Sequence, residues 1–208
     1  MAHVSLPHDA KAGPTKSEVR SVLVGKLDLG PADHFVEVGS CTGAVTVEAA
    51  RQAGRVTALE RNSERLETTE KNLAANDVTA NVRLREAEAP DGLPDDADAL
   101  FLGGSRNYES VLDHVVDTGV DRVVMNVSRL EVAGNATEAF RERGLLDEVV
   151  QFQVSHGYEL AGATGFDSEN PVYMLVGGVD DETGQVATDG GPVDSGAPDG
   201  ETMDGGDR

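Results

Sequence analysis

The run Phe35-Val-Glu-Val-Gly39-Ser-Cys-Thr-Gly43 decides the fold, because an apolar segment passes directly into a turn that contains two glycines. Such a run is typical of a buried strand that leads into a helix, and glycine lets the backbone of the turn approach a ligand closely. In a doubly wound α/β sheet this turn lies beyond the carboxyl end of the strand, where ligands bind. We therefore predict a strand over His34–Val38, a ligand-binding loop, and a helix over Ala44–Gln52.

Strands and helices alternate on both sides of this unit. Thr15 and Glu18 form a candidate capping box for a preceding helix, and Ser63 is a candidate N-cap for a following one. Further helices are predicted over Tyr108–Val116 and Glu131–Arg143. Further strands are predicted over Arg55–Glu60, Asn81–Arg85, Asp98–Leu102, Arg122–Val127, Glu148–Ser155 and Pro171–Val176. Because no helix separates the last two strands, we expect an α/β fold whose doubly wound, mostly parallel seven-stranded sheet has an antiparallel C-terminal strand.

The chain of 208 residues divides into one globular domain and a tail. Residues 180–208 contain nine Asp or Glu, seven Gly and a single basic residue, Arg208. Such a segment buries too little apolar surface to offset the entropy of ordering it. We therefore predict one globular domain over 1–179 and an acidic, glycine-rich, disordered tail over 180–208.

The balance of charge restricts the partners. The chain has 17 Lys and Arg against 38 Asp and Glu, which gives a net charge of −21. A protein that binds nucleic acid or an anionic membrane unaided needs an excess of cations, so neither partner is expected. Because only four basic residues are lysines and aromatic residues make up 4%, the composition is typical of a halophilic protein.

The cysteine content, the spacing of the histidines and the N-terminal sequence exclude other classes of protein. The single cysteine, Cys41, rules out an internal disulfide and a cysteine-based zinc site. The five histidines show no metal-binding spacing, so no metal site is predicted. The N-terminus has no apolar core typical of a signal peptide, and no stretch is long and apolar enough to span a membrane. We therefore expect a cytoplasmic protein.

Two carboxylates indicate the ligand of the loop. The spacing from Gly39 to Gly43 also resembles a phosphate loop of a dinucleotide-binding fold, and that alternative remains open on the glycines alone. Glu37, however, lies in the strand two residues before Gly39, where it suits a cationic ligand and is a poor neighbour for a pyrophosphate. Glu60 ends the next strand, where a carboxylate accepts hydrogen bonds from ribose hydroxyls. This combination favours S-adenosylmethionine.

Seven short motifs then make the chain resemble one family, the cobalt-precorrin C(15)-methyltransferases (decarboxylating) of cobalamin biosynthesis. The motifs occur in the family's order over about residues 5–178, and they are Ala12-Gly-Pro-Thr-Lys-Ser-Glu-Val-Arg20, Val38-Gly-Ser-Cys-Thr-Gly43, Glu60-Arg-Asn62, Glu67-Thr-Thr-Glu-Lys-Asn-Leu73, Glu86-Ala-Glu-Ala-Pro90, Phe101-Leu-Gly-Gly-Ser105 and Asn170-Pro-Val-Tyr173. The resemblance implies a class I methyltransferase fold and an enzyme that methylates C-15 of cobalt-precorrin-6B from S-adenosyl-L-methionine. It also implies loss of the ring C acetate carboxylate as CO2, and a homotetramer.

The resemblance also implies which residues bind the cofactor. These are Thr15, Gly39, Ser40, Cys41, Thr42, Gly43, Glu60, Glu88 and Ala89, to which the argument from charge adds Glu37. Three positions depart from the family pattern. Cys41 replaces the middle glycine of GxGxG, Ala87 replaces a glycine, and Gly103-Gly-Ser-Arg-Asn107 replaces a longer glycine run.

The acceptor of such an enzyme is a polycarboxylate, which an acidic protein must meet with local cations. We predict Lys16, Arg106 and Arg129 as carboxylate clamps, and Gly103, Gly104 and Ser105 as further lining of the substrate mouth. Two alternatives remain open: a methyltransferase of RNA or protein, and a non-catalytic nucleotide-binding domain. The run Asn170-Pro-Val-Tyr173 resembles a base-flipping motif but lacks its second proline and lies by the last strand, so we interpret it as structural.

Overall fold

The computed structural model describes residues 3–10, 13–104 and 106–179. The predicted tail over 180–208 lies outside the described residues, and so does Ser105. Five helices are present in the described part of the chain: α1 (Ser17–Leu27), α2 (Ala44–Ala50), α3 (Ser63–Ala75), α4 (Tyr108–Thr118) and α5 (Leu130–Glu142). The strands there are β1 (His34–Val38), β2 (Arg55–Glu60), β3 (Val82–Glu86), β4 (Ala99–Leu102), β5 (Arg122–Val127), β6 (Leu146–Phe152), β7 (Ser155–Leu160), β8 (Ala163–Ser168) and β9 (Val172–Gly177).

Seven of these strands form one sheet in the order β3-β2-β1-β4-β5-β9-β6. Strands β3, β2, β1, β4 and β5 pair in parallel, whereas β9 lies antiparallel to both β5 and β6. The prediction of a mostly parallel seven-stranded sheet with an antiparallel C-terminal strand is confirmed. The order reverses between β1 and β4, and this switch point is where an α/β sheet opens a crevice for ligands.

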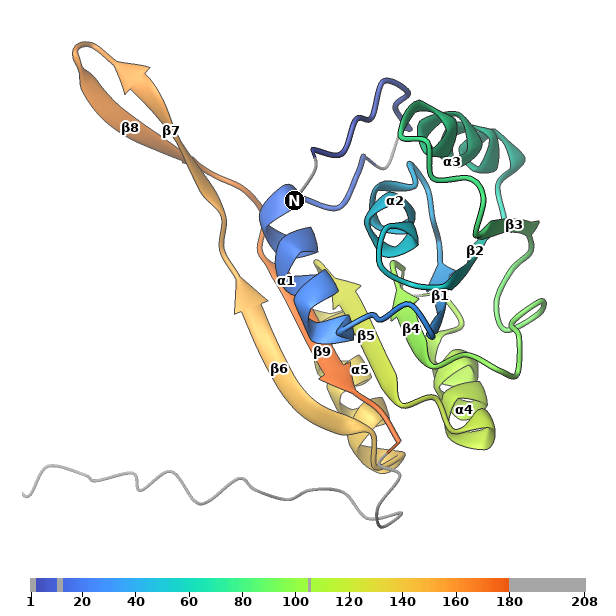
Figure 1. The fold of residues 1–208 in the computed structure, drawn as a ribbon. Coiled ribbons are helices and arrows are strands. Elements are labelled where there is room, and N and C mark those ends of the chain that lie inside the picture. Colours follow the sequence, from blue (N-terminus) through green and yellow to red (C-terminus); the bar gives the residue numbers. More distant parts are fainter. Residues whose placement is uncertain (1–2, 11–12, 105, 180–208) are drawn as a thin grey trace, which may run out of the picture.

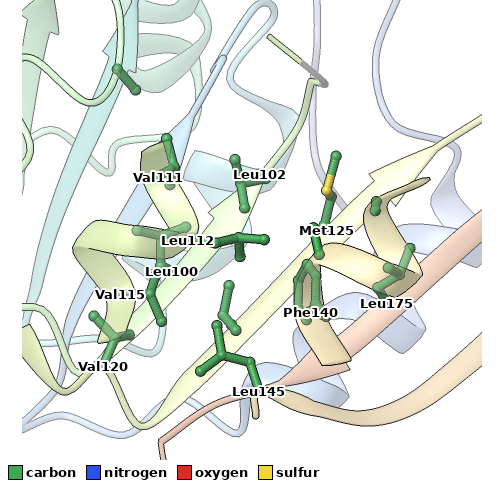
Figure 2. Packing of buried hydrophobic residues seen from close by; sticks show 14 of the residues in the cluster. Leu100, Leu102, Val111, Leu112, Val115, Val120, Met125, Phe140, Leu145 and Leu175 are labelled. Atoms are coloured by element: carbon green, nitrogen blue, oxygen red, sulfur yellow. The ribbon is translucent and has the colours of Figure 1, made fainter. Parts of the chain in front are cut away.

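Alternation along the strands gives the sheet two apolar faces. Leu100, Leu102 and Met125 face α4 and α5, where they pack with a larger buried cluster that includes Phe140 (Figure 2). The intervening residues, among them Phe101, face α1 and α2 in a second cluster. Burial of this apolar surface on both faces is the main force that holds the helices to the sheet. None of the described helices is long and apolar enough to cross a membrane.

Both predicted helix caps are wrong in detail. Helix α1 begins at Ser17 after Lys16, with no side-chain cap, and the backbone carbonyl of Thr15 instead accepts a hydrogen bond of 2.7 Å from Arg20 Nη1. The cap of α3 is Asn62, whose side chain accepts from the backbone N–H of Arg65 at 3.0 Å, and Ser63 is the first helical residue. Sequence patterns locate the start of a helix only to within one or two residues, whereas the capping role belongs to a single position.

The hairpin of β7 and β8 was not predicted. It forms a separate two-stranded sheet that reaches away from the body of the molecule (Figure 1). Its turn has positive φ at Ala161 and Gly162, the geometry of a two-residue hairpin loop that matches strand twist. Almost all of its side chains are exposed, so the strands lack the buried apolar residues by which sequence reasoning finds a strand.

Candidate functional site

Two adjoining cavities open at the switch point. The first, about 180 Å³, we call the Glu60 cavity, and the second, about 290 Å³, we call the Glu37 cavity, each after its buried carboxylate. Gly39, Cys41 and Gly103 line both. A ligand with two chemically different halves would therefore lie across the loop that joins β1 to α2, with one half in each cavity.

Glycine is required in this loop for two different reasons. The loop bends back at Gly39, whose φ is +87° and whose N–H donates to the carbonyl of Leu59 at 2.8 Å. Gly43 has φ of +75°, and a Cβ there would come within 3.0 Å of the side chain of Thr69 in α3. Ser40 and Thr42 complete the turn, and the Ser40 hydroxyl lies 3.0 Å from Thr69 Oγ1. The loop is thus fixed by its own backbone and by α3.

Glu60, at the end of β2, holds the loop from the other side. Its Oε2 accepts a hydrogen bond from the backbone N–H of Cys41 at 3.2 Å, and its Oε1 accepts one from Asn62 N–H at 3.0 Å. Each carboxylate oxygen can accept a second hydrogen bond. The side chain is buried but lines the Glu60 cavity. This is the arrangement that the predicted role of Glu60 needs, an anchored carboxylate with acceptor capacity left for the hydroxyls of a ribose.

Glu37 is a buried carboxyl group on β1 that lines the Glu37 cavity. The Thr46 hydroxyl donates a hydrogen bond of 2.5 Å to its Oε2. Burial raises the pKa of Glu37 to about 8, with a smaller contribution from the negative charge of Glu60, although the Thr46 hydrogen bond acts in the opposite direction. Such a buried carboxyl group favours the binding of a cation, because the cation stabilises the ionised form that burial disfavours.

Cys41, where the family has a middle glycine, has φ of +53°. The left-handed region is strained for a residue with a Cβ, so the sequence departure has a direct structural consequence. Burial raises the pKa of its thiol, which makes it a poor nucleophile. Its Sγ lies 3.8 Å from the carbonyl oxygen of Gly13, so the side chain is turned toward the N-terminal segment.

Cys41→Gly is expected to stabilise the unliganded protein by about 1 kcal/mol, because glycine adopts this φ without strain. Chemical denaturation at fixed salt measures the change. Cys41→Ala is the matched control, since it removes the thiol but keeps the Cβ and therefore the strain. Equal stabilisation by both variants would show that the thiol, and not the backbone, is responsible.

The other residues predicted to bind the cofactor divide between the cavities. Glu88 and Ala89 line the Glu60 cavity, and Thr15 lines the Glu37 cavity. The Nδ2 of Asn107 donates to the carbonyl of Ala89 at 3.0 Å, which holds the segment after β3 against the segment after β4. Of the residues predicted to bind the cofactor, all but Gly43 therefore line one or both cavities, and their roles stay a prediction.

The residues predicted to bind the substrate are not all brought together at the two cavities. Lys16 lines the Glu37 cavity, but its Nζ already lies 2.7 Å from Glu169 and donates to the carbonyl of Asn170 at 2.8 Å. Arg106 lies in the Glu60 cavity, 3.5 Å from Glu88. Arg129 is exposed at the start of α5 and lines neither cavity. Gly103 lines both cavities, Gly104 lines the Glu60 cavity, and Ser105 lies outside the described residues.

Sequence reasoning missed how the first part of the N-terminal segment is held against α3. Asn72 of α3 accepts from the backbone N–H of His8 at 3.1 Å, and its Nδ2 donates to the carbonyls of His8 and Thr42, each at 2.8 Å. Asn76 forms a similar pair of bonds with Ser5. Two amide side chains thus tie the segment to α3, and one of them also holds the loop.

Asn126, Ser128 and Val172 were also missed, and all three line the Glu37 cavity. Asn126 carries a signal that the sequence contained, since it is a polar residue within the apolar strand β5. Across residues 3–10, 13–104 and 106–179, no group of three His, Cys, Asp or Glu side chains is placed to hold a metal ion.

Comparison with known proteins gives consistent matches. A family model described as a precorrin methyltransferase domain matches residues 7–177. A protein of Halobacterium salinarum, named "Probable cobalt-precorrin-6B C(15)-methyltransferase (decarboxylating)", is 74% identical over 183 residues, which are 88% of this chain and 98% of the relative.

Solved structures agree. The precorrin-6Y C5,15-methyltransferase of Geobacter metallireducens superposes with a TM-score of 0.76 at 32% identity, covering 85% of this chain and 97% of that one. The precorrin 8W decarboxylase of Methanobacterium thermoautotrophicum gives a TM-score of 0.75 at 33% identity, over 80% of this chain and 92% of that one. The predicted methyltransferase fold is confirmed.

Proposed function

This chain belongs to the precorrin methyltransferase domain family, and we propose that it methylates C-15 of cobalt-precorrin-6B and releases the ring C acetate carboxylate as CO2. The observation that carries the proposal is the pair of buried carboxylates, Glu60 and Glu37, placed on either side of one glycine loop. The name of the 74% identical relative supports the acceptor. It favours a corrin over RNA or protein, as does the net charge of −21.

The residues present fit S-adenosyl-L-methionine, which supplies the methyl group on a positively charged sulfur. Glu60 would accept the ribose hydroxyls in its cavity, with Ala87 and Ala89 as apolar lining for the adenine. Glu37 would lie on the methionyl side and hold its carboxylate against the positive charge. A Cβ on Gly103 would lie 3.1 Å from the carbonyl oxygen of Gly39, so the close approach of these two segments depends on glycine.

In this arrangement the protein's contribution is positioning. The loop from Gly39 to Gly43 is held by Glu60 and α3, so we expect it to change little when a ligand binds. Methyl transfer is a displacement that requires the acceptor carbon in line with the sulfur, and fixing two reactants in that geometry supplies much of the rate. The Glu37 cavity is where the acceptor would approach, since the buried amide of Asn126 on β5 lines it as well.

Calorimetry with S-adenosylmethionine and with NAD tests the class of cofactor, and binding of NAD alone would refute the proposal. Mass spectrometry of cobalt-precorrin-6B after turnover tests the reaction. The expected product has gained one methyl group and lost one CO2. A methyl gain without loss of CO2 would show that the chain catalyses only the first half.

We also propose a homo-oligomer, a homotetramer as the family resemblance implies, assembled through the β7–β8 hairpin. An isolated two-stranded hairpin is marginally stable in water, yet this one exposes Tyr158, Leu160 and Phe166. Contact with hairpins of further copies would bury these side chains. Sedimentation of wild type and of Phe166→Asp compares the assembly states, and a monomeric wild type would contradict the proposal.

We also propose that the protein is cytoplasmic and adapted to high salt. The net charge of −21 supports the adaptation, because it makes the folded chain repel itself. We expect the midpoint of thermal unfolding to rise steadily with KCl up to roughly 2 M, because salt screens that repulsion. Scanning calorimetry at increasing KCl measures it. A midpoint that falls or stays constant would contradict the adaptation.

A further inference from the structure

The end of β5 carries a polar group that the proposed cofactor site does not use. Asn126 lines the Glu37 cavity, and both its amide nitrogen and its amide oxygen are buried without a hydrogen-bond partner in the part of the chain that the structure describes. Burying an amide without partners destabilises a protein, and native structures rarely keep one without a reason. An apolar residue of similar size would fit the strand better, so stability does not explain Asn126.

Asn126 lies on the same face of the sheet as Glu37. Strand pairing sets Glu37 beside Phe101 of β4, and Phe101 beside Val124 of β5. Side chains two residues apart on a strand share a face, so Asn126 continues the row from Val124 toward the cavity. The rest of this row is apolar core. The carboxyl of β1 and the amide of β5 are thus two polar groups at the cavity end of one apolar surface.

These two groups occupy different halves of the cavity. Glu37 lies beside the glycine loop, whereas Asn126 lies two strands away, next to Val127 and Ser128. Its partner across the sheet is Met174 of β9, the strand whose first residue, Val172, closes the cavity on that side. The Asn126 half is therefore the part that the methionyl end of the cofactor leaves open for the acceptor.

In this half of the cavity the side chains that can donate a hydrogen bond to a guest are neutral ones. Lys16 is the one basic side chain among the described residues that line the cavity, and Glu169 lies 2.7 Å from its ammonium group. The Asn126 amide near the end of β5 and the hydroxyl of Ser128, which follows that strand, then remain as neutral side-chain donors in this half. The terminal torsion of an asparagine is soft, so the amide can turn its NH2 group toward a bound guest.

We infer that Asn126 donates a hydrogen bond to a carboxylate of the corrin acceptor, and that this carboxylate is the one released as CO2. The inference rests on the proposed function. In that step the bond between the acetate CH2 and its carboxyl carbon breaks, the electron pair stays with the corrin, and a proton from water replaces the carboxyl group. The carboxylate loses its charge as it becomes CO2. A cationic clamp would stabilise the charged starting state most, whereas a neutral amide orients it with less of that penalty.

Asn126→Leu and Asn126→Asp test the inference, with wild type assayed first on cobalt-precorrin-6B. We expect Asn126→Leu to raise the KM for the corrin about tenfold while its unfolding midpoint rises, because two unpartnered polar atoms are removed. Asn126→Asp should raise the KM further, since two carboxylates repel. The affinity for S-adenosylhomocysteine, measured by calorimetry, should stay unchanged in both. Met174→Leu repacks the same face without lining the cavity and is expected to match wild type.

Several outcomes would overturn the inference. An Asn126→Leu variant that is stabilised and keeps the wild-type KM and kcat would show that the amide has no role in the reaction. Weaker binding of S-adenosylhomocysteine would place the amide in the cofactor half. An Asn126→Asp variant with wild-type KM would show that the group accepts rather than donates. If wild type itself neither methylates nor decarboxylates the corrin, the proposed function fails, and the inference fails with it.

Discussion

Glu60→Gln is expected to weaken S-adenosylmethionine binding by about 10- to 100-fold, because a hydrogen bond to a charged group is worth roughly 1.5–3 kcal/mol. The geometry makes the effect large. Both carboxylate oxygens already accept backbone N–H groups, from Cys41 and from Asn62. A glutamine has one oxygen and one NH2 group, so it serves one of these backbone donors at most. The variant therefore has fewer acceptors for the ribose hydroxyls, and it also holds the loop less tightly.

Isothermal titration with S-adenosylmethionine measures the effect, and denaturation of the unliganded variant measures how much of it is structural. Glu86→Gln is a matched control. Glu86 ends β3 beside Glu60, as its direct register partner, but it is exposed and lines neither cavity. A Glu60→Gln variant that binds within about twofold of wild type would remove the carboxylate from the cofactor site, because twofold corresponds to only about 0.4 kcal/mol.

Sequence patterns predicted the sheet because burial on both faces leaves a readable signal. A strand such as Ala99–Leu102 is apolar throughout, and its neighbours in the sheet are equally covered by helices. The glycine loop could be recognised for a related reason, since the positive φ at Gly39 and Gly43 favours glycine at those positions. Cys41 marked the one departure from this pattern, and the structure shows it in the same left-handed region.

The features that could not be predicted depend mainly on contacts, or on exposure, that only the folded chain defines. The hairpin of β7 and β8 extends away from the rest of the chain (Figure 1), and almost all of its side chains are exposed, so it has no apolar period to detect. The hydrogen bonds from Asn72 to His8 and to Thr42 join three segments of the chain, and any two of these residues are at least 30 positions apart in the sequence. Asn126 was visible as a polar residue in a strand, but only the structure shows that its amide is buried and without a partner in the described chain.

Glu37→Gln is expected to make the protein more stable and a weaker binder of the cofactor. Because burial raises the pKa of Glu37 from 4.5 to about 8, the folded protein holds this proton more tightly than the unfolded chain does. The stability that Glu37 contributes is therefore full below pH 4.5 and is lost as the pH rises through about 8. A glutamine keeps a carbonyl acceptor for the Thr46 hydroxyl and has no proton to lose.

The gain in stability should consequently depend on pH. We expect Glu37→Gln to exceed wild type by several kcal/mol at pH 8.5 and by much less near pH 5, because the penalty in wild type grows with pH for as long as the unfolded carboxyl group is ionised and the folded one still holds its proton. Denaturation curves at a series of pH values measure this. A difference between the two proteins that is constant with pH would contradict the buried, protonated state of Glu37.

Cofactor binding should show the opposite dependence. In wild type the affinity for S-adenosylmethionine should rise as the pH approaches 8, since the cation pairs with the ionised carboxylate, whereas Glu37→Gln should bind more weakly and without that rise. Thr46→Val offers a second, independent measurement. The Thr46 hydrogen bond lowers the pKa of Glu37, so its removal should move the rise in affinity to higher pH. A carboxyl group that only filled space in the core would give none of these shifts, because its proton would not be linked to the ligand.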